Sequence, residues 1–190
     1  MHVLYVRDSK SRGYLRIGVS DGEAKSEYHL SKLEYTEIGS PVIGDELCDI
    51  ERLKEFDMRY RGRLYALRIL AYGDNNRKTL IRKLILKSIP VRIAAEIADE
   101  MIGLGYVNEE KQLERLIVNE VNVKLSGREK VVMKLIAKGY GRKKIEEITD
   151  RLISEGMIDF EESKKKLIEK KLSSDAGEAE IKVLLYKYGY

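Results

Sequence analysis

LIRKLILKSIPVRIAAEIADEMIGLGYVNEEKQ, at residues 80–112, is followed by a second version of the same pattern, VVMKLIAKGYGRKKIEEITDRLISEGMIDFEES, at residues 131–163. When Leu80 is aligned with Val131, ten of the 33 residue pairs are identical, and most of the others exchange similar side chains. Repeats of this length with helical periodicity are typical of stacked helical units, each of which buries its apolar face against its neighbours. The stretch therefore predicts a mainly α fold of elongated tandem three-helix repeats.

Apolar residues at helical spacing place the helices within these repeats. We expect helices near residues 76–88, 91–103, 109–124, 127–138 and 142–154. One face of each helix is apolar and is expected to form the core. The predicted core residues are Leu80, Ile81, Leu84, Ile85, Ala94, Ile97, Ala98, Met101, Leu113, Leu116, Ile117, Val121, Val131, Val132, Leu135, Ile136, Ile145, Ile148 and Leu152.

Polar residues and glycines mark the predicted helix ends. Either Asn75 or Asn76 can cap the helix that follows it, because an Asn side chain accepts a hydrogen bond from the backbone of the first turn. Ser126 and Glu129 form a capping-box pattern. Glycines typically end helices in the left-handed conformation. The other predicted caps are Asn108, Asp159 and Asp175 at helix starts, and Gly105 and Gly156 at helix ends.

The first 40 residues show a different periodicity. Apolar and other residues alternate through residues 15–19, which predicts a strand, and Asp21-Gly22 then gives a turn signal. From Asp45 the spacing of the apolar residues becomes helical. We therefore expect a small β element followed by a helix from Asp45. Cys48 is then predicted to be a small core residue of that helix.

These patterns divide the chain into five segments. The first is a small β element and the second a connecting helix, while the third and fourth are complete helical repeats. The fifth repeats the pattern of the first two helices of a unit, but its third helix is missing. The predicted segments are 1–44, 45–62, 63–105, 106–156 and 157–190.

Composition argues against several protein classes. The single cysteine among 190 residues excludes an internal disulfide and any multi-cysteine metal site. No apolar stretch approaches the roughly 20 residues of a membrane span. The sequence contains no phosphate-binding loop, metal-ligand spacing or nucleophile motif. We therefore expect a cytoplasmic protein that is not an enzyme and that uses no cofactor or metal.

Four segments together resemble the RecX family of RecA regulators. ALRILAY at residues 66–72 and NRKTLIRKL at residues 76–84 are similar to the opening repeat of that family. GYVNE at residues 105–109 is similar to its Gly-apolar-apolar-Asp-Asp turn, and LIAKGY at residues 135–140 to its second repeat. The chain departs from the family pattern at Asn108, where the family has an acidic residue. The resemblance extends over nearly the whole chain.

The resemblance implies a modulator in homologous recombination, DNA repair and the SOS response. RecX-like proteins are elongated and curved, and they lie in the deep groove of the RecA–DNA filament. They inhibit its ATPase, strand-exchange and co-protease activities, either by blocking filament growth or by occupying the groove. The implied partners are the RecA filament and, non-specifically, single-stranded or double-stranded DNA, and the chain is expected to be a monomer.

Basic residues recur at equivalent repeat positions and form the candidate partner-binding surface. Residues 1–62 carry 10 Lys and Arg against 12 Asp and Glu, so the excess of cations lies in the helical part of the chain. A single exposed lysine more often solvates a helix face than binds a partner, but recurrence favours the set as a whole. This set, the basic stripe, consists of Lys83, Lys87, Arg92, Lys134, Lys138, Arg142, Lys143, Lys144 and Lys187.

Two other functions remain open from the sequence. The helical units also resemble helix-turn-helix domains, with Gly139-Tyr140-Gly141 as the turn, so the chain can be a direct DNA-binding protein. A base-reading helix is typically rich in Arg, Asn and Gln, whereas residues 142–151 are mostly Lys, Glu and Ile. The third interpretation is a helical-repeat adaptor that binds another protein. In either case Tyr140 is expected to be a core anchor rather than a stacking surface.

Overall fold

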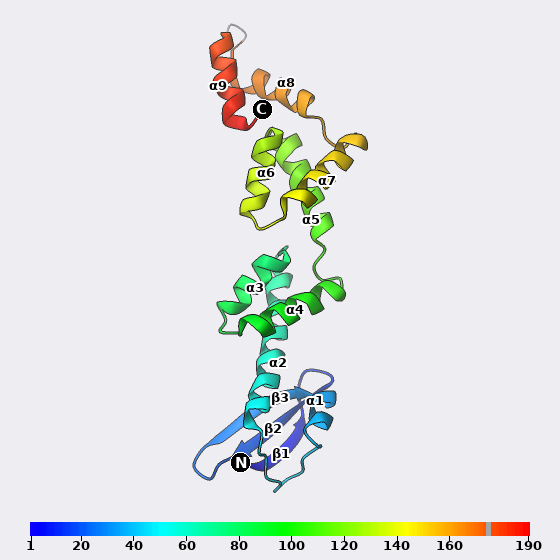
Figure 1. The fold of residues 1–190 in the computed structure, drawn as a ribbon, viewed down its shortest axis with the longest axis vertical. Helices are drawn as coiled ribbons and strands as arrows, with labels where there is room; N and C mark the ends of the chain where they lie inside the picture. The colour runs from blue at the N-terminus through cyan, green and yellow to red at the C-terminus, as the bar shows by residue number, and fades with distance from the viewer. Residues whose placement is uncertain (174–175) are drawn as a thin grey trace. The chain divides into compact units, whose positions relative to one another are not determined.

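The computed structural model describes residues 1–173 and 176–190 and is mainly helical. In those residues a three-stranded antiparallel sheet precedes nine α-helices and one π-helix (Figure 1). The chain forms two compact units, the first made of residues 1–73 and 80–104 and the second of residues 74–79 and 105–190. The predicted fold class is confirmed, whereas the five-segment division stays a prediction.

Unit 1 combines the sheet with four helices. Its strands are β1 (His2–Asp8), β2 (Tyr14–Ser20) and β3 (Lys25–Ser31), and its helices are α1 (Lys32–Glu37), α2 (Ile50–Ala71), α4 (Val91–Gly103) and the part of α3 (Arg77–Ile85) that begins at Leu80. The helices of unit 2 are α5 (Glu109–Val118), the π-helix η1 (Asn119–Val123), α6 (Arg128–Ala137), α7 (Arg142–Ser154), α8 (Phe160–Lys171) and α9 (Glu178–Tyr188).

The sheet has the strand order β1-β2-β3 and buries one face. Ile17 and Val19 of β2 are fully buried on the core face, and Gly18 between them is also buried, against the Tyr5 ring. They pack with Leu30 of β3 and with Leu53 and Phe56 at the start of α2. This small core fixes the sheet against α2.

The helix predicted from Asp45 begins instead at Ile50, so that prediction is wrong. Its cap is Asp49, whose carboxylate accepts a hydrogen bond from Arg52 N–H at 3.0 Å. The residues before it follow the first strand, because the carbonyl of Asp45 accepts a bond from Val3 N–H at 3.0 Å. Cys48 lies in this extended stretch and is exposed, not part of the core.

Residues 32–37 form α1, a short helix inside the segment that the sequence assigned to the β element. Ser31 and Glu34 make a reciprocal capping box: the Ser31 hydroxyl accepts from Glu34 N–H at 3.2 Å, and Glu34 Oε2 accepts from Ser31 N–H at 2.7 Å. The Ser-x-x-Glu pattern at these positions is typical of a helix start, and the interpretation of this segment as strands did not take it into account.

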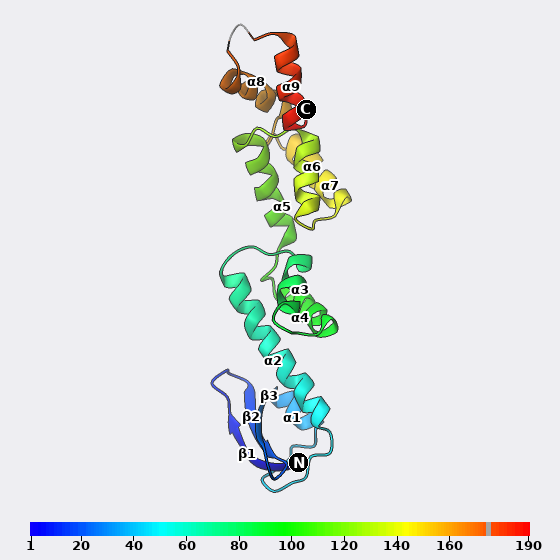
Figure 2. The same cartoon turned by 90° about the vertical axis from the view of Figure 1, so that its left-hand side faces the viewer.

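In unit 1, α4 packs closely against α2 (Figure 2). Gly62 makes the close approach possible, because a Cβ at that position would lie 2.3 Å from Cδ1 of Ile97. Asn76 caps α3 as predicted, with its Oδ1 accepting from Thr79 N–H at 2.8 Å. α3 ends at Ile85, earlier than predicted, because Ser88 takes a positive φ of 61° in the following turn.

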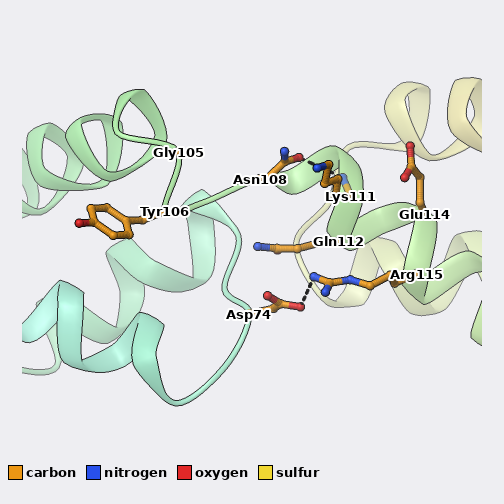
Figure 3. A pocket seen from close by; sticks show the side chains of 8 residues that line it. All are labelled: Asp74, Gly105, Tyr106, Asn108, Lys111, Gln112, Glu114 and Arg115. Atoms are coloured by element: carbon orange, nitrogen blue, oxygen red, sulfur yellow. Dashed lines mark hydrogen bonds and ion pairs between the residues drawn. The ribbon is translucent and has the colours of Figure 1, made fainter.

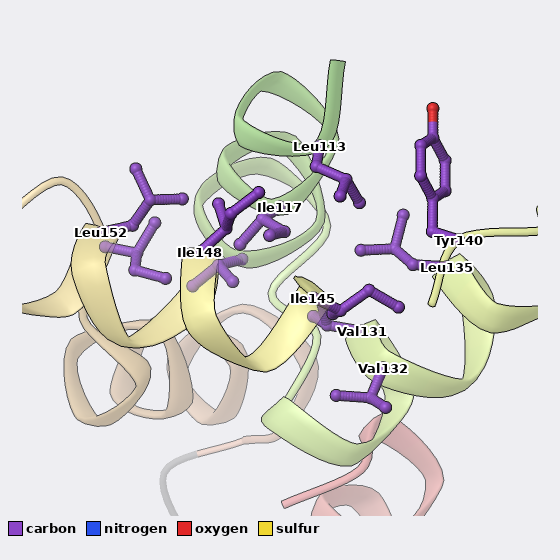
Figure 4. Packing of buried hydrophobic residues seen from close by; sticks show 11 residues of the cluster. Leu113, Ile117, Val131, Val132, Leu135, Tyr140, Ile145, Ile148 and Leu152 are labelled. Carbon is purple, nitrogen blue, oxygen red and sulfur yellow. The ribbon is translucent and has the colours of Figure 1, made fainter. Parts of the chain in front are cut away.

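Unit 2 is built around one apolar cluster contributed by α5, η1, α6 and α7 (Figure 4). The predicted core residues of α7 and most of those of α5, η1 and α6 are buried there, and Tyr140 joins them with its hydroxyl donating to Gln112 Oε1 at 3.0 Å. Leu113, Val131 and Leu135 are fully buried. The predicted caps Asn108 and Asp159 are also confirmed.

Three predicted details of the repeats are wrong or untested. Ile85 and Ile136, predicted as core, are 40% and 41% exposed because they lie at the edge of the apolar face. The Ser126–Glu129 capping box does not form, since Gly127 is the N-cap of α6 and the Ser126 hydroxyl donates to Glu120. The predicted cap Asp175 lies outside the described residues. Gly105 and Gly156 adopt the expected left-handed conformation.

Candidate partner-binding surface

The basic stripe is divided between the two units, and unit 1 contributes three of its residues. Lys83 is half-buried on α3. Lys87 follows α3, with its ammonium 5.9 Å from the centre of the Tyr65 ring. Arg92 on α4 bonds to two carboxylates, Glu55 and Glu96, each at 2.8 Å. The hydrogen bond that Arg92 donates to Glu55 raises the pKa of Arg92, and the same bond lowers the pKa of Glu55.

In unit 2, Lys134 is held by a buried acid. Its Nζ donates to Oε2 of Glu120 at 2.6 Å, and Lys124 donates to the other carboxylate oxygen at 2.6 Å. Glu120 is 3% exposed and lies in η1, the π-helix, which carries its side chain inward. Burial acts to raise the pKa of Glu120, but hydrogen bonds from Lys124 and Lys134 outweigh it and leave the pKa lowered. Lys134 is therefore a structural partner of Glu120.

The remaining residues of the stripe lie on or next to α6, α7 and α9. Lys138 is exposed after α6, and its carbonyl accepts from Asn76 Nδ2 at 2.9 Å. Lys187 is exposed on α9, with its carbonyl bound by Lys130 Nζ at 3.0 Å. At the start of α7, three consecutive cations each lie within 4 Å of one carboxylate. These are Arg142 with Glu146, Lys143 with Glu147, and Lys144 with Glu109.

In the structure, Arg92, Lys134, Arg142, Lys143 and Lys144 of the stripe pair with carboxylates. Apart from the pair with buried Glu120, these ion pairs lie at the surface, where such pairs contribute little to stability and exchange partners readily. They also reduce the positive potential that would attract a phosphate backbone. Lys143 is the most exposed of the paired cations, with a side chain 92% accessible. Whether the stripe contacts a partner stays a prediction.

Partly exposed isoleucines also recur at equivalent positions of the two repeats. Ile85 on α3 is 40% exposed, and its repeat equivalent Ile136 on α6 is 41% exposed. Ile102 on α4 is 38% exposed, and its equivalent Ile153 on α7 is 41% exposed. Sequence reasoning missed this pattern because it assigned Ile85 and Ile136 to the core and gave Ile102 and Ile153 no role. The signal in the sequence was that isoleucine occupies both members of each pair of equivalent repeat positions.

A polar hollow of about 300 Å³ lies within unit 2 (Figure 3). The Asp74 carboxylate accepts a bond from Arg115 at 2.6 Å, and the Asn108 side chain accepts from Lys111 N–H at 3.0 Å. These bonds fasten the segment before α3 and the start of α5. The lining residues are Asp74, Gly105, Tyr106, Asn108, Lys111, Gln112, Glu114 and Arg115.

Among residues 1–173 and 176–190, no group of three or more His, Cys, Asp and Glu side chains is arranged to hold a metal ion. In the same part of the chain, no helix has both the length and the apolar character needed to cross a bilayer.

Comparison with protein families and with curated proteins finds no match. A solved structure does match: the crystal structure of a regulatory protein RecX aligns with a TM-score of 0.74 at 18% identity. The alignment covers 100% of this chain and 94% of that chain. The fold is that of a RecX protein. RecX from Lactobacillus salivarius also aligns, with a TM-score of 0.47 at 17% identity over 70% of this chain and 97% of that chain.

The similarity to the RecX fold extends over the whole of this chain. It agrees with the fold that the family resemblance implied. At this level of identity the match establishes the architecture and assigns no binding residue. The function therefore has to be inferred from the side chains that are exposed in this chain.

Proposed function

We propose that this protein is a RecX-like regulator that binds the RecA–DNA filament and inhibits its ATPase, recombinase and co-protease activities. One observation carries the proposal: Ile85 and Ile136 are equally exposed apolar side chains at equivalent repeat positions, as are Ile102 and Ile153. A filament presents the same subunit surface many times. A chain that repeats its own exposed side chains is suited to such a partner.

Physical chemistry favours several weak contacts over one strong contact in this case. A half-exposed isoleucine has little apolar area left to bury, so one such contact is weak. When contacts are linked in one chain, each later one is made at a high effective concentration, which strengthens binding overall. Basic residues around the isoleucines, such as Lys87 and Lys138, then belong to a polar rim that guides association.

The fold match supports the same function, because the matched protein is a regulatory protein. We further propose that the chain acts by binding alone, as a monomer in the cytoplasm. The hollow on unit 2 is lined by charges that neutralise one another, such as Asp74 and Arg115, rather than by a nucleophile and base. Inhibition would then require no chemistry, cofactor or metal from this chain.

The test is RecA ATPase activity on single-stranded DNA, measured with increasing amounts of this protein. We expect ATPase activity to fall as the molar ratio approaches one chain of this protein for every few RecA subunits. The assay is repeated with additional DNA, because inhibition that additional DNA relieves would arise from sequestered DNA instead of a bound filament. Unchanged ATPase activity at one chain per RecA subunit would show that the proposal is wrong.

A further inference from the structure

The sheet of unit 1 has a second face that its core does not use (Figure 1). In one row across the strands, Tyr5 of β1 lies opposite Gly18 of β2, which lies opposite Glu27 of β3. Because side chains alternate between the faces of a sheet, these three share one face, while Ile17 beside them points to the core. This second face carries aromatic and charged residues at partial exposure.

Tyr5 lies flat on this face. A Cβ added to Gly18 would lie 2.3 Å from Cε1 of the Tyr5 ring, so only glycine allows the ring to rest against the β2 backbone. The Tyr5 hydroxyl donates to Oε2 of Glu27 at 2.5 Å, which fixes the direction of the ring. The Arg7 guanidinium lies over the ring, 5.0 Å from the ring centre. The ring is therefore oriented in advance, and it remains partly exposed.

The next row on the same face places two arginines opposite each other. Arg7 of β1 pairs directly with Arg16 of β2. Like charges in that position destabilise a sheet. Glu27 offsets this in part, since its Oε2 lies 3.6 Å from the Arg16 guanidinium. Arg7 remains exposed beside it. The row therefore keeps two like charges side by side, which favours a role in binding over a role in stability.

We propose that this face binds single-stranded nucleic acid, with an unstacked base taking the place of the Arg7 guanidinium over the Tyr5 ring and backbone phosphates on Arg7 and Arg16. We call Tyr5, Arg7, Arg16 and Glu27 the sheet platform. Although residues 1–62 have more acids than bases, the strand residues on this face include three cations, Arg7, Arg16 and Lys25, and one acid. The positive charge is thus concentrated where a phosphate backbone would lie.

Single strands suit this geometry better than duplexes do. A flat aromatic ring on an open sheet stacks a base that is free of its neighbours, and such stacking tolerates any sequence. In a duplex the faces of the bases are already stacked and are not accessible to the ring. One guanidinium group binds two phosphate oxygens at once, so arginine is a suitable cation for the phosphate backbone of a nucleic acid. The site is separate from the basic stripe, and it does not depend on the RecA proposal.

The experiment measures fluorescence anisotropy of a labelled oligothymidylate of about 16 nucleotides with the full-length chain and no RecA. We expect saturable binding that an unlabelled duplex of the same length competes for weakly. Tyr5→Leu should raise Kd about tenfold, as expected for the loss of one stacked base. Tyr5→Phe keeps the ring and should bind within about twofold of wild type.

The phosphate contacts are tested with the Arg7→Gln/Arg16→Gln double variant. It should reduce the slope of log K against log salt by about 1.4, since each phosphate contact with a single strand contributes about 0.7. The matched control, Lys32→Gln/Lys54→Gln, removes the same charge from α1 and α2 and should keep the wild-type slope.

Thermal melting checks that each variant is folded before its binding is interpreted. Three results would each overturn the proposal. The first is the absence of oligothymidylate binding by the wild-type chain, and the second is equal competition by the duplex. The third is wild-type affinity in a folded Tyr5→Leu variant together with a wild-type salt slope in the arginine double variant. If Tyr5→Leu fails to fold, the arginine variant and its lysine control still decide the outcome.

Discussion

Lys134 of α6 donates a hydrogen bond to the buried carboxylate of Glu120 at 2.6 Å, from a position 14 residues further along the chain. The sequence counted Lys134 among the partner-binding cations because it recurs opposite Lys83 in the repeat alignment. In the folded unit it instead neutralises an acid that is 3% exposed. Recurrence in a repeat therefore selects side chains for structural reasons as well as for binding, and each residue has to be judged by its contacts.

Replacing Glu120 with Gln should destabilise unit 2 by about 1–3 kcal/mol, the usual range when a hydrogen-bonded charged group is lost. The variant leaves Lys134 and Lys124 facing a neutral amide. Urea unfolding at pH 7 measures the effect. The matched control is Glu146→Gln, which removes an exposed acid paired with Arg142 and should cost far less. Equal stabilities of the two variants would contradict a structural role for the buried carboxylate.

The same carboxylate should make stability depend on pH. The pKa of Glu120 is lowered in the folded protein from its ordinary value of 4.5. A lowered folded pKa means that the stabilisation is complete above the unfolded value and is lost as the pH falls through the folded value. The difference in unfolding free energy between wild type and Glu120→Gln should therefore be constant from pH 7 to about pH 5 and shrink below it. A difference that grows on acidification would show the opposite sign of shift.

Leu135→Ala should destabilise the protein by about 2–5 kcal/mol, because it leaves a cavity in a packed core. Leu135 is fully buried in the cluster of unit 2. Met133 on the same helix is 68% exposed, so Met133→Ala is the control and should change stability by less than about 1 kcal/mol. The measurement is the midpoint of thermal unfolding. A Leu135→Ala midpoint equal to that of wild type would mean that the assigned helix phase is wrong.

The sequence predicted α4 and α7 to the residue, and the reason lies in local signals. Pro90 and Gly141 precede these helices, and Gly105 and Gly156 follow them in the left-handed conformation. Such signals act within a few residues. They do not depend on the rest of the chain, so the boundaries predicted from the sequence agree with those in the structure.

The start of α2 was predicted wrongly because its cause is distant in the chain. Residues 45–47 bond to the first strand, as the Leu47 N–H does to the carbonyl of Met1 at 2.7 Å. The helical spacing of apolar residues alone does not reveal that these backbone groups bond to a distant part of the chain instead of forming a helix. The candidate site shows the same limit, since neither the Lys134–Glu120 contact nor the ring of Tyr5 over Gly18 follows from local periodicity. The partial exposure of Ile85 and Ile136 also depends on packing beyond their own helices.

The double variant Ile85→Gln/Ile136→Gln tests the apolar contacts of the proposed regulator. It should weaken inhibition of RecA ATPase, raising the half-maximal concentration by about tenfold if each side chain contributes a weak linked contact. Leu86→Gln is the control, because Leu86 is 77% exposed and its repeat equivalent is Ala137. Circular dichroism verifies folding. Inhibition by the folded double variant at wild-type strength would remove the observation on which the proposed function rests.

Charge reversal tests the basic stripe, and the structure decides which lysines to reverse. Lys134→Glu would place a second carboxylate beside buried Glu120, so lost inhibition could then reflect damage to unit 2. The exposed residues Lys87, Lys138, Lys143 and Lys187 are the better choice. Reversing all four to Glu should weaken inhibition of RecA ATPase at low salt and make the residual inhibition less sensitive to salt.

A control with the same change in net charge separates the stripe from a general effect of charge. Reversing Lys165, Lys170, Lys171 and Lys182, which are exposed on α8 and α9 outside the stripe, provides it. If the stripe contacts the filament, the control variant should keep most of its inhibition while the stripe variant loses it. Both should retain their helical circular dichroism, because exposed charges contribute little to stability. Equal losses in the two variants would mean that overall charge, rather than this surface, guides association. Full inhibition by the stripe variant at both low and moderate salt would leave the stripe as a solvated face and place the contact on the repeated isoleucines alone.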